Sequence, residues 1–296
     1  MTNEITEITT PNSQSTTVNP SRRQFLRTAT IGSVLGLAGC LSAGSETGEA
    51  TPTAEREAIE DISFEGEHLV LTATEKFRGT ELHVVGPTET VWAKTETEPT
   101  TGKARIRLLD VDGVGEDNHY SPGMFRFVFE PRGEDPYTEK LELVPDVSIL
   151  GVRQRSGEVP RGAGQIAVKL QNSGTAPTWI SDVKYEGASH YTATGNFTES
   201  DFPYLSGLDE PTEAIIPPSE TREFVAQNFP LRFINSSEEQ CSQPQFTMGI
   251  SVKTPIKYLD DNRIRVKTGG ETILSSSSDS YVCTNVELQL FRIGDE

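Results

Sequence analysis

The chain has 296 residues, of which 34% are hydrophobic, and its 44 acidic and 26 basic side chains give a formal net charge of −18. A surface this acidic repels nucleic-acid phosphates, and no basic patch interrupts it, so we expect no nucleic-acid partner. Self-repulsion of this charge disfavours a compact state unless salt screens it, and at molar salt the screening length is about 3 Å.

The first 39 residues have the features of an export signal. Arg22 and Arg23 form a twin arginine ahead of an apolar run, 28–39, that is too short to span a bilayer. The segment Ser-Arg-Arg-Gln-Phe-Leu resembles the twin-arginine export consensus. The run ends in Leu-Ala-Gly-Cys40, which resembles the lipobox of secreted lipoproteins. The resemblance implies that Cys40 becomes the lipidated first residue of the mature chain.

The composition resembles that of proteins from halophiles, because the chain is acidic and has more arginine than lysine. Together with the export signal, it is similar to the exported lipoproteins of haloarchaea. The resemblance implies a protein anchored by lipid to the outer face of the cytoplasmic membrane. An ordinary acidic surface protein is the alternative.

Residues 40–60 are predicted to be a flexible tether. The segment 41–58 consists of Ser, Thr, Glu, Gly and Ala with almost nothing apolar. It cannot bury enough surface to offset the entropy of ordering. Residues 53–62 are also compatible with one or two weak helical turns.

Residues 61–145 read as short strands separated by turns. In the most regular run, Ala104, Ile106 and Leu108 alternate with basic residues, as in a half-buried strand. With no long helix in the pattern, these runs predict an antiparallel sandwich. The predicted strands are 68–74, 81–85, 90–95, 103–108, 124–130 and 139–144.

A second strand-rich region, 146–296, follows Pro145. We expect a hairpin turn at 260–262 and an irregular region at 186–218. The whole fold is therefore predicted to be all-β with two sandwich domains, 61–145 and 146–296, and one continuous larger sandwich is the alternative. The predicted strands are 147–154, 164–171, 179–185, 221–229, 245–254, 262–267 and 281–293.

Residues 168–180 carry a second resemblance. The segment Val-Lys-Leu-Gln-Asn-Ser-Gly, followed by Pro177 and Trp179, resembles the start of adhesion-related (CARDB-like) immunoglobulin-like domains of archaeal and bacterial surface proteins. The turn 216–221 is similar to the proline-containing turn of that family, although Ser219 stands where glycine is usual. The resemblance implies an antiparallel immunoglobulin-like β-sandwich and supplies no catalytic residues.

The cysteines suggest one disulfide. With Cys40 taken by lipid, Cys241 and Cys283 remain as a possible pair in an oxidising compartment. Closing a loop of about 43 residues contributes roughly 4 kcal/mol in the chain-entropy model. The neighbouring apolar residues are even-numbered, so strand geometry places both cysteines on the outer face. A two-cysteine metal site without a nearby histidine is the weaker alternative.

Enzyme motifs are not found. The mature chain contains no nucleophile elbow, Walker loop or His-Glu-x-x-His pattern. Four histidines, His68, His83, His119 and His190, are scattered along it. We expect a structural role for His83, whereas His119 and His190 precede tyrosines in loops, a setting that also suits a metal or ligand. We therefore predict a protein that is not an enzyme.

One acidic loop is a candidate calcium site. Asp110, Asp112, Glu116 and Asp117 lie in a glycine-containing loop, and calcium prefers such closely spaced oxygen ligands. The strict EF-hand pattern fails because Val114 stands where Asp or Asn is required. A solvated acidic turn is the alternative, and we expect no other cofactor.

Two acceptor triplets, at Asn196 and Asn235, match the N-glycosylation pattern. Asn196 lies in a long irregular loop, 187–207, whose aromatic residues either cap the sandwich or form a partner-binding surface.

The sequence thus predicts a lipid-anchored, non-catalytic cell-surface protein that interacts with an envelope protein or polymer of unknown identity. The alternative is a ligand-capture lipoprotein serving a transporter. The chain does not show the alternating strand and helix pattern of two-lobed solute-binding proteins, which disfavours that alternative.

Overall fold

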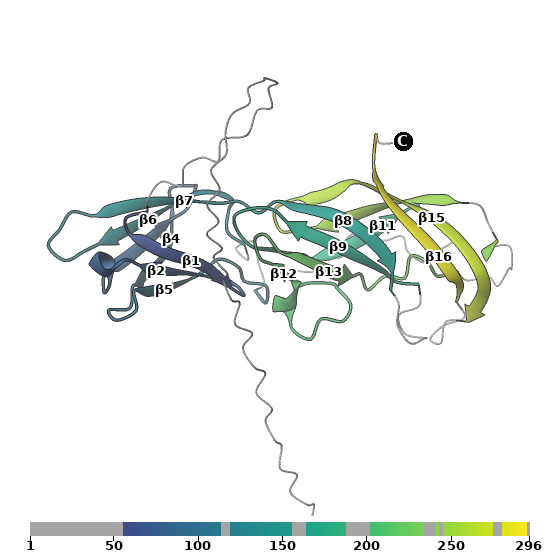
Figure 1. The fold of residues 1–296 in the computed structure, drawn as a ribbon, viewed down its shortest axis with the longest axis horizontal. Helices are drawn as coiled ribbons and strands as arrows, with labels where there is room; N and C mark the ends of the chain where they lie inside the picture. Colours follow the sequence, from purple (N-terminus) through teal and green to yellow (C-terminus); the bar gives the residue numbers. More distant parts are fainter. Residues whose placement is uncertain are drawn as a thin grey trace, which may run out of the picture. The chain divides into compact units, whose positions relative to one another are not determined.

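The computed structural model describes residues 56–113, 119–155, 164–187, 202–233, 241–242, 245–274 and 280–294. Apart from two short 3-10 helices, η1 (Glu75–Phe77) and η2 (Pro211–Ala214), the regular elements in these ranges are β-strands (Figure 1). The predicted all-β class is confirmed. Within the described residues, no helix has the length and apolar content that crossing a membrane requires.

Strands between residues 59 and 143 form two antiparallel sheets. Their inward side chains, among them Phe125, Phe127 and Leu71, belong to one buried cluster, so the sheets pack face to face. One sheet has the order β1 (Ile59–Glu65), β2 (His68–Ala73), β5 (Lys103–Arg107). The other has the order β4 (Val91–Glu96), β3 (Glu81–Val85), β6 (Gly123–Glu130), β7 (Tyr137–Leu143).

The remaining strands form two larger antiparallel sheets and one small one. Val168 and Leu170 of the three-stranded sheet and Ile250 and Ile264 of the four-stranded sheet belong to the same buried cluster. The three-stranded sheet has the order β13 (Thr221–Val225), β9 (Ile166–Asn172), β8 (Val147–Gln154). The four-stranded sheet has the order β11 (Asp182–Glu186), β14 (Phe246–Lys253), β15 (Tyr258–Leu274), β16 (Tyr281–Arg292), and β10 (Thr178–Trp179) pairs with β12 (Ile215–Ile216).

The chain passes from the first pair of sheets to the others between Leu143 and Val147, where the sequence predicts a domain joint. Residues 53–296 nevertheless form one compact unit, and the buried apolar cluster contains side chains from both groups of sheets. The division into two domains therefore stays a prediction, and one continuous larger sandwich stays its alternative.

The start of the folded part differs from the prediction. Instead of helical turns over 53–62 or a tether reaching residue 60, β1 begins at Ile59 and pairs with β2. The carboxylate of Glu139 on β7 accepts hydrogen bonds from the backbone N–H groups of Ala58 and Ile59, at 3.0 and 3.2 Å. A partner eighty positions away thus orders a segment whose own composition predicts disorder.

Two further corrections concern chain reversals. The expected hairpin turn at 260–262 is wrong, because β15 runs through it and the turn is at 254–257, where the Thr254 N–H donates to the Lys257 carbonyl at 3.0 Å. Residues 260–261 instead form a β-bulge opposite β14. The predicted strand 179–185 is also interrupted, since β10 and β11 belong to different sheets.

Asn172 connects the segments that meet at the joint. It ends β9 and is fully buried. Its Oδ1 accepts hydrogen bonds from the N–H groups of Asp146 and Gly174, at 3.0 and 3.1 Å. Its Nδ2 donates to the carbonyls of Ala176 and Ile216, at 2.8 and 3.0 Å. One amide side chain therefore bonds four backbone groups, and its two hydrogen bonds to carbonyls are buried.

The turn that follows Asn172 needs a glycine. A Cβ at Gly174 would lie 2.2 Å from the carbonyl oxygen of Val144, which is closer than any real contact. Next to it, the hydroxyl of Thr175 donates to the Glu142 carbonyl at 2.7 Å and accepts from the Val144 N–H at 3.0 Å. The Asn-x-Gly-Thr segment thus holds the end of β7 through both side chains and close backbone packing.

Replacing Asn172 with alanine should lower the free energy of unfolding by about 3 kcal/mol, because two buried and two partly buried backbone groups lose their partner. Chemical denaturation at constant salt measures the loss. Asn285→Ala, at an exposed position of β16, is the matched control and should change stability by less than about 0.5 kcal/mol. Equal stability of the two variants would contradict the assigned role.

Candidate functional site

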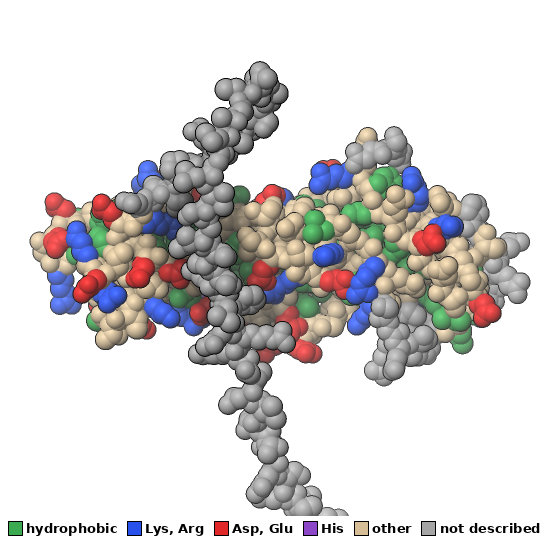
Figure 2. All heavy atoms as spheres, in the orientation of Figure 1, with side chains coloured by type: hydrophobic (Ala, Val, Ile, Leu, Met, Phe, Trp, Pro, Cys, Tyr) green, Lys and Arg blue, Asp and Glu red, His purple; other side chains and the backbone are tan. Residues whose placement is uncertain are grey.

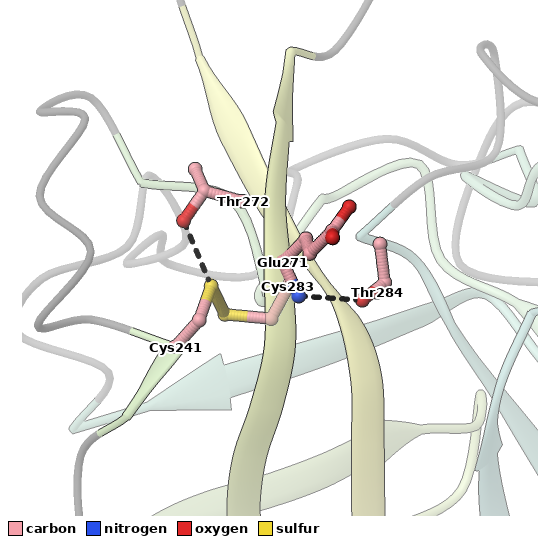
Figure 3. The surroundings of a disulfide bond; sticks show 5 residues. All are labelled: Cys241, Glu271, Thr272, Cys283 and Thr284. Atoms are coloured by element: carbon pink, nitrogen blue, oxygen red, sulfur yellow. Dashed lines mark hydrogen bonds between the residues drawn. A yellow bond between two sulfur atoms is a disulfide. The ribbon is translucent and has the colours of Figure 1, made fainter.

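The structure joins Cys241 and Cys283 in a disulfide with a Cα–Cα distance of 5.4 Å, so the predicted pairing is confirmed (Figure 3). The sequence predicts an outer-face position for both cysteines, and in the structure both are buried in a cluster separate from the main core. Cys283 does face away from Val282 and the main core, but Phe233 and Tyr281 cover it in a second, smaller apolar cluster.

A β-bulge in β15 directs a side chain toward the disulfide. Register shifts between Gly269 and Thr272, and Gly270 has the positive φ of 77° that glycine adopts easily. Beyond the bulge Thr272 lies opposite Cys283, and its hydroxyl donates to Cys241 Sγ at 3.2 Å (Figure 3). The backbone N–H of Glu271 donates to a threonine hydroxyl on β16 at 2.8 Å. The disulfide therefore attaches the segment at Cys241 to β16, and Thr272 of β15 adds a hydrogen bond to the same bridge.

Replacing both cysteines with serine (C241S/C283S) should lower the free energy of unfolding by about 4 kcal/mol, since the disulfide closes a loop with a sequence separation of 42. Thiol titration of the unreduced, denatured mature chain should find no free thiol at either position. Thr272→Val, which keeps the disulfide, is the control. A free thiol at Cys241 would contradict the pairing.

The acidic loop has an ion pair at its start. Asp110 Oδ1 accepts from the guanidinium of Arg107 at 2.6 Å, and the same guanidinium lies 3.0 Å from Glu67. Glu67 also accepts the N–H of Val111 at 2.7 Å. Asp112 is described, whereas Glu116 and Asp117 lie outside the described residues. Calcium binding by this loop stays a prediction, and Arg107 would compete with the ion for Asp110.

His119 is a partly buried residue with hydrogen-bond partners on both sides of its ring. Its Nδ1 lies 2.6 Å from the Tyr120 carbonyl and its Nε2 lies 3.1 Å from the Thr178 hydroxyl, so both ring nitrogens have partners. The Tyr120 hydroxyl donates to the carbonyl of Pro177 at 2.9 Å. Burial lowers the pKa of His119 to about 4 and raises the pKa of Tyr120. Through these contacts, the loop that contains His119 and Tyr120 is hydrogen-bonded to Pro177 and to Thr178 of β10.

The depressed pKa of His119 makes stability depend on pH. The unfolded chain protonates this ring near pH 6.5 but the folded chain only near pH 4, so stability falls as pH falls through that window. Between pH 7.5 and pH 5 the contribution of His119 to this loss is about 2 kcal/mol. The H119Q variant should lose correspondingly less stability over the same range, as measured by denaturant unfolding. Identical pH profiles would contradict the burial of a neutral ring.

A carboxylate and imidazole cluster lies on the outer face of the β4-β3-β6-β7 sheet. Glu81 and His83 are two residues apart on β3, and Glu130 on β6 pairs directly with Glu81. His83 Nε2 lies 2.7 Å from Glu81 Oε1, and its Nδ1 lies 3.5 Å from Glu130 Oε1. The hydrogen bond from His83 and its charge lower the pKa of Glu81. A cavity of about 380 Å³ beside the cluster is lined by Gly79, Glu81, Lys94, Thr95, Glu96, Glu130 and Arg132.

A larger groove of about 580 Å³ lies beside β1 and β7, which are both edge strands. Its lining combines apolar side chains, such as Phe64 and the half-exposed Met124, with the cationic side chains of Arg56 and Lys140. The lining includes the turn residues Gly174 and Ser219. Sequence reasoning missed this groove because its residues come from five separate segments, at 56–64, 124, 140–142, 174–175 and 218–219.

Several predicted site residues lie outside the described residues: Arg22, Arg23, Cys40, Asn196 and Asn235. Of the long loop 187–207, the structure describes Gly187 and residues 202–207. There, Leu205 is buried and forms a bridge with Ala226, while Phe202 is exposed. This part of the loop packs on the sandwich near β13.

Charges of both signs are distributed over the surface. On the face shown in Figure 2, acidic and basic side chains are interspersed instead of gathered by sign. Many form exposed ion pairs, such as Arg126 with Glu89 and Arg153 with Glu223. Exposed pairs of this kind contribute little stability individually.

Comparison with protein-family models and with curated proteins gives no match. Among solved structures, the chain is similar over 73% of its length to a β-glucuronidase from glycoside hydrolase family 2, with 7% identity, 21% of that chain covered and a TM-score of 0.21. It is also similar to Salmonella α2-macroglobulin reacted with methylamine (11% identity, 73% and 15% coverage, TM-score 0.20) and to Escherichia coli α2-macroglobulin activated by porcine elastase (8%, 76% and 21%, 0.19). The chain thus spans about a fifth or less of these proteins, and TM-scores this low support no argument about shared function.

Proposed function

We propose that this is an exported, lipid-anchored cell-surface protein that works by non-catalytic interaction with other envelope components. The twin arginine at Arg22 and Arg23 directs export, and lipid on Cys40 holds the protein at the outer face of the cytoplasmic membrane. The partner is an envelope protein or polymer. The adhesion-related immunoglobulin-like resemblance at 168–180 supports an interaction role.

The observation that carries the proposal is where the folded part begins. β1 starts at Ile59, so residues 41–58 separate the anchor at Cys40 from the first strand. The folded part consists of antiparallel sheets with their core side chains buried together. A buried disulfide suits an oxidising compartment outside the cytoplasm. A tethered, disulfide-braced β protein is well suited to present a surface to partners.

A second candidate, ligand capture for a transporter, is favoured by the groove beside β1 and β7. Its volume of about 580 Å³ lies in the range of small-molecule sites. A solute that binds only the folded state raises the melting temperature, and the rise continues as its concentration increases above the dissociation constant. Melting the mature chain at high salt with candidate solutes therefore separates the two functions. Crosslinking on intact cells tests the first of them by identifying a reproducible partner.

Replacing Cys40 with serine should move the protein from the membrane fraction to the soluble fraction, because the lipid attachment point is lost. Fractionation of cells at their native salt, followed by immunodetection, measures the change. The matched control R22K/R23K should instead retain the unprocessed chain inside the cell. Continued membrane association of C40S would contradict lipid anchoring.

A further inference from the structure

We propose that Glu81, His83 and Glu130 form a binding site for one divalent transition-metal ion, of which Zn²⁺ is the best fit. The site lies on the outer face of the β4-β3-β6-β7 sheet, away from the disulfide and the acidic loop. It is independent of the proposed anchoring and interaction function.

The β-sheet holds the three ligands together. Side chains two positions apart on one strand share a face, as Glu81 and His83 do, and directly paired residues are nearest neighbours across strands, as Glu81 and Glu130 are. One ligand atom from each side chain can be chosen so that all three lie within 4.8 Å of one another. Zinc lies about 2.0–2.2 Å from each of its nitrogen and oxygen ligands, so the three ligand atoms must move closer together to bind one ion. The carboxylate groups of the two glutamates are exposed and can make this movement.

The charge arrangement calls for a cation. Glu96 on β4 pairs with Glu81, which pairs with Glu130, so three carboxylates form one row across neighbouring strands. Like charges directly opposite one another are destabilising. Lys94 and Arg132 line the same cavity, but neither makes an ion pair within 4 Å with a described carboxylate. Lys94, which pairs with His83 on the neighbouring strand, offsets part of this repulsion at Glu81, and a divalent ion would offset more of it.

The donor set selects the kind of metal. An imidazole nitrogen with carboxylate oxygens suits zinc and similar transition metals, whereas calcium takes oxygen ligands alone. The adjoining cavity of about 380 Å³ leaves room for the waters that complete the coordination.

Calorimetric titration of the full mature chain with ZnCl₂ at pH 7.5 tests the site, with Co²⁺ absorption as a second readout of nitrogen ligation. We expect one equivalent to bind, with binding at least tenfold weaker in H83A and in E130Q. His68→Ala is the matched control, because His68 also lies on a strand beside glutamates, and it should bind as the unaltered protein does.

The melting temperature of each variant without metal is measured first, so that a folding defect is not mistaken for lost ligands. If H83A unfolds, E130Q and E81Q decide the question, since both keep the size of the side chain. No binding by the unaltered protein overturns the proposal. Binding that is the same in H83A, or in the glutamine variants, also overturns it.

Discussion

The turn at residues 172–175 packs tightly against the end of β7, and this contact constrains how the chain passes between the two groups of sheets. Asn172 uses its whole amide to satisfy two N–H groups and two carbonyls, and it does so without solvent exposure. Gly174 permits the approach because any side chain there would overlap the Val144 carbonyl. This side-chain network replaces the strand pairing that is lost where the chain passes from one pair of sheets to the next.

Two other contacts fix segments elsewhere in the fold in a similar way. Glu139 holds the first ordered residues through two backbone N–H groups, and the disulfide attaches the segment at Cys241 to β16. In each case one side chain or covalent bond orders a segment that has few apolar residues of its own.

Much of the fold could be predicted from local pattern. Strand β8 has the predicted bounds Val147–Gln154, and β6 (Gly123–Glu130) covers the predicted strand 124–130. Pattern failed where distant partners decide: β1 forms because Glu139 and β2 reach it, and the 260–261 segment became a bulge because β14 continues alongside. The disulfide could be inferred from the number of cysteines and from the oxidising compartment that the export signal implies. Its burial depends on Phe233, whose position no sequence periodicity indicates. His83 meets Glu130 only through the pairing of β3 with β6.

Hydrogen exchange measured residue by residue on the mature chain tests the central claim, that Asn172 makes the joint part of the folded core. The backbone amides of Asp146 and Gly174, which donate to its side chain, should exchange as slowly as the amide of Phe127 in the middle of β6. The exposed Gly133 in the β6–β7 turn provides the fast reference. Exchange at Asp146 and Gly174 as fast as at Gly133 would show that the joint opens independently and would contradict the account.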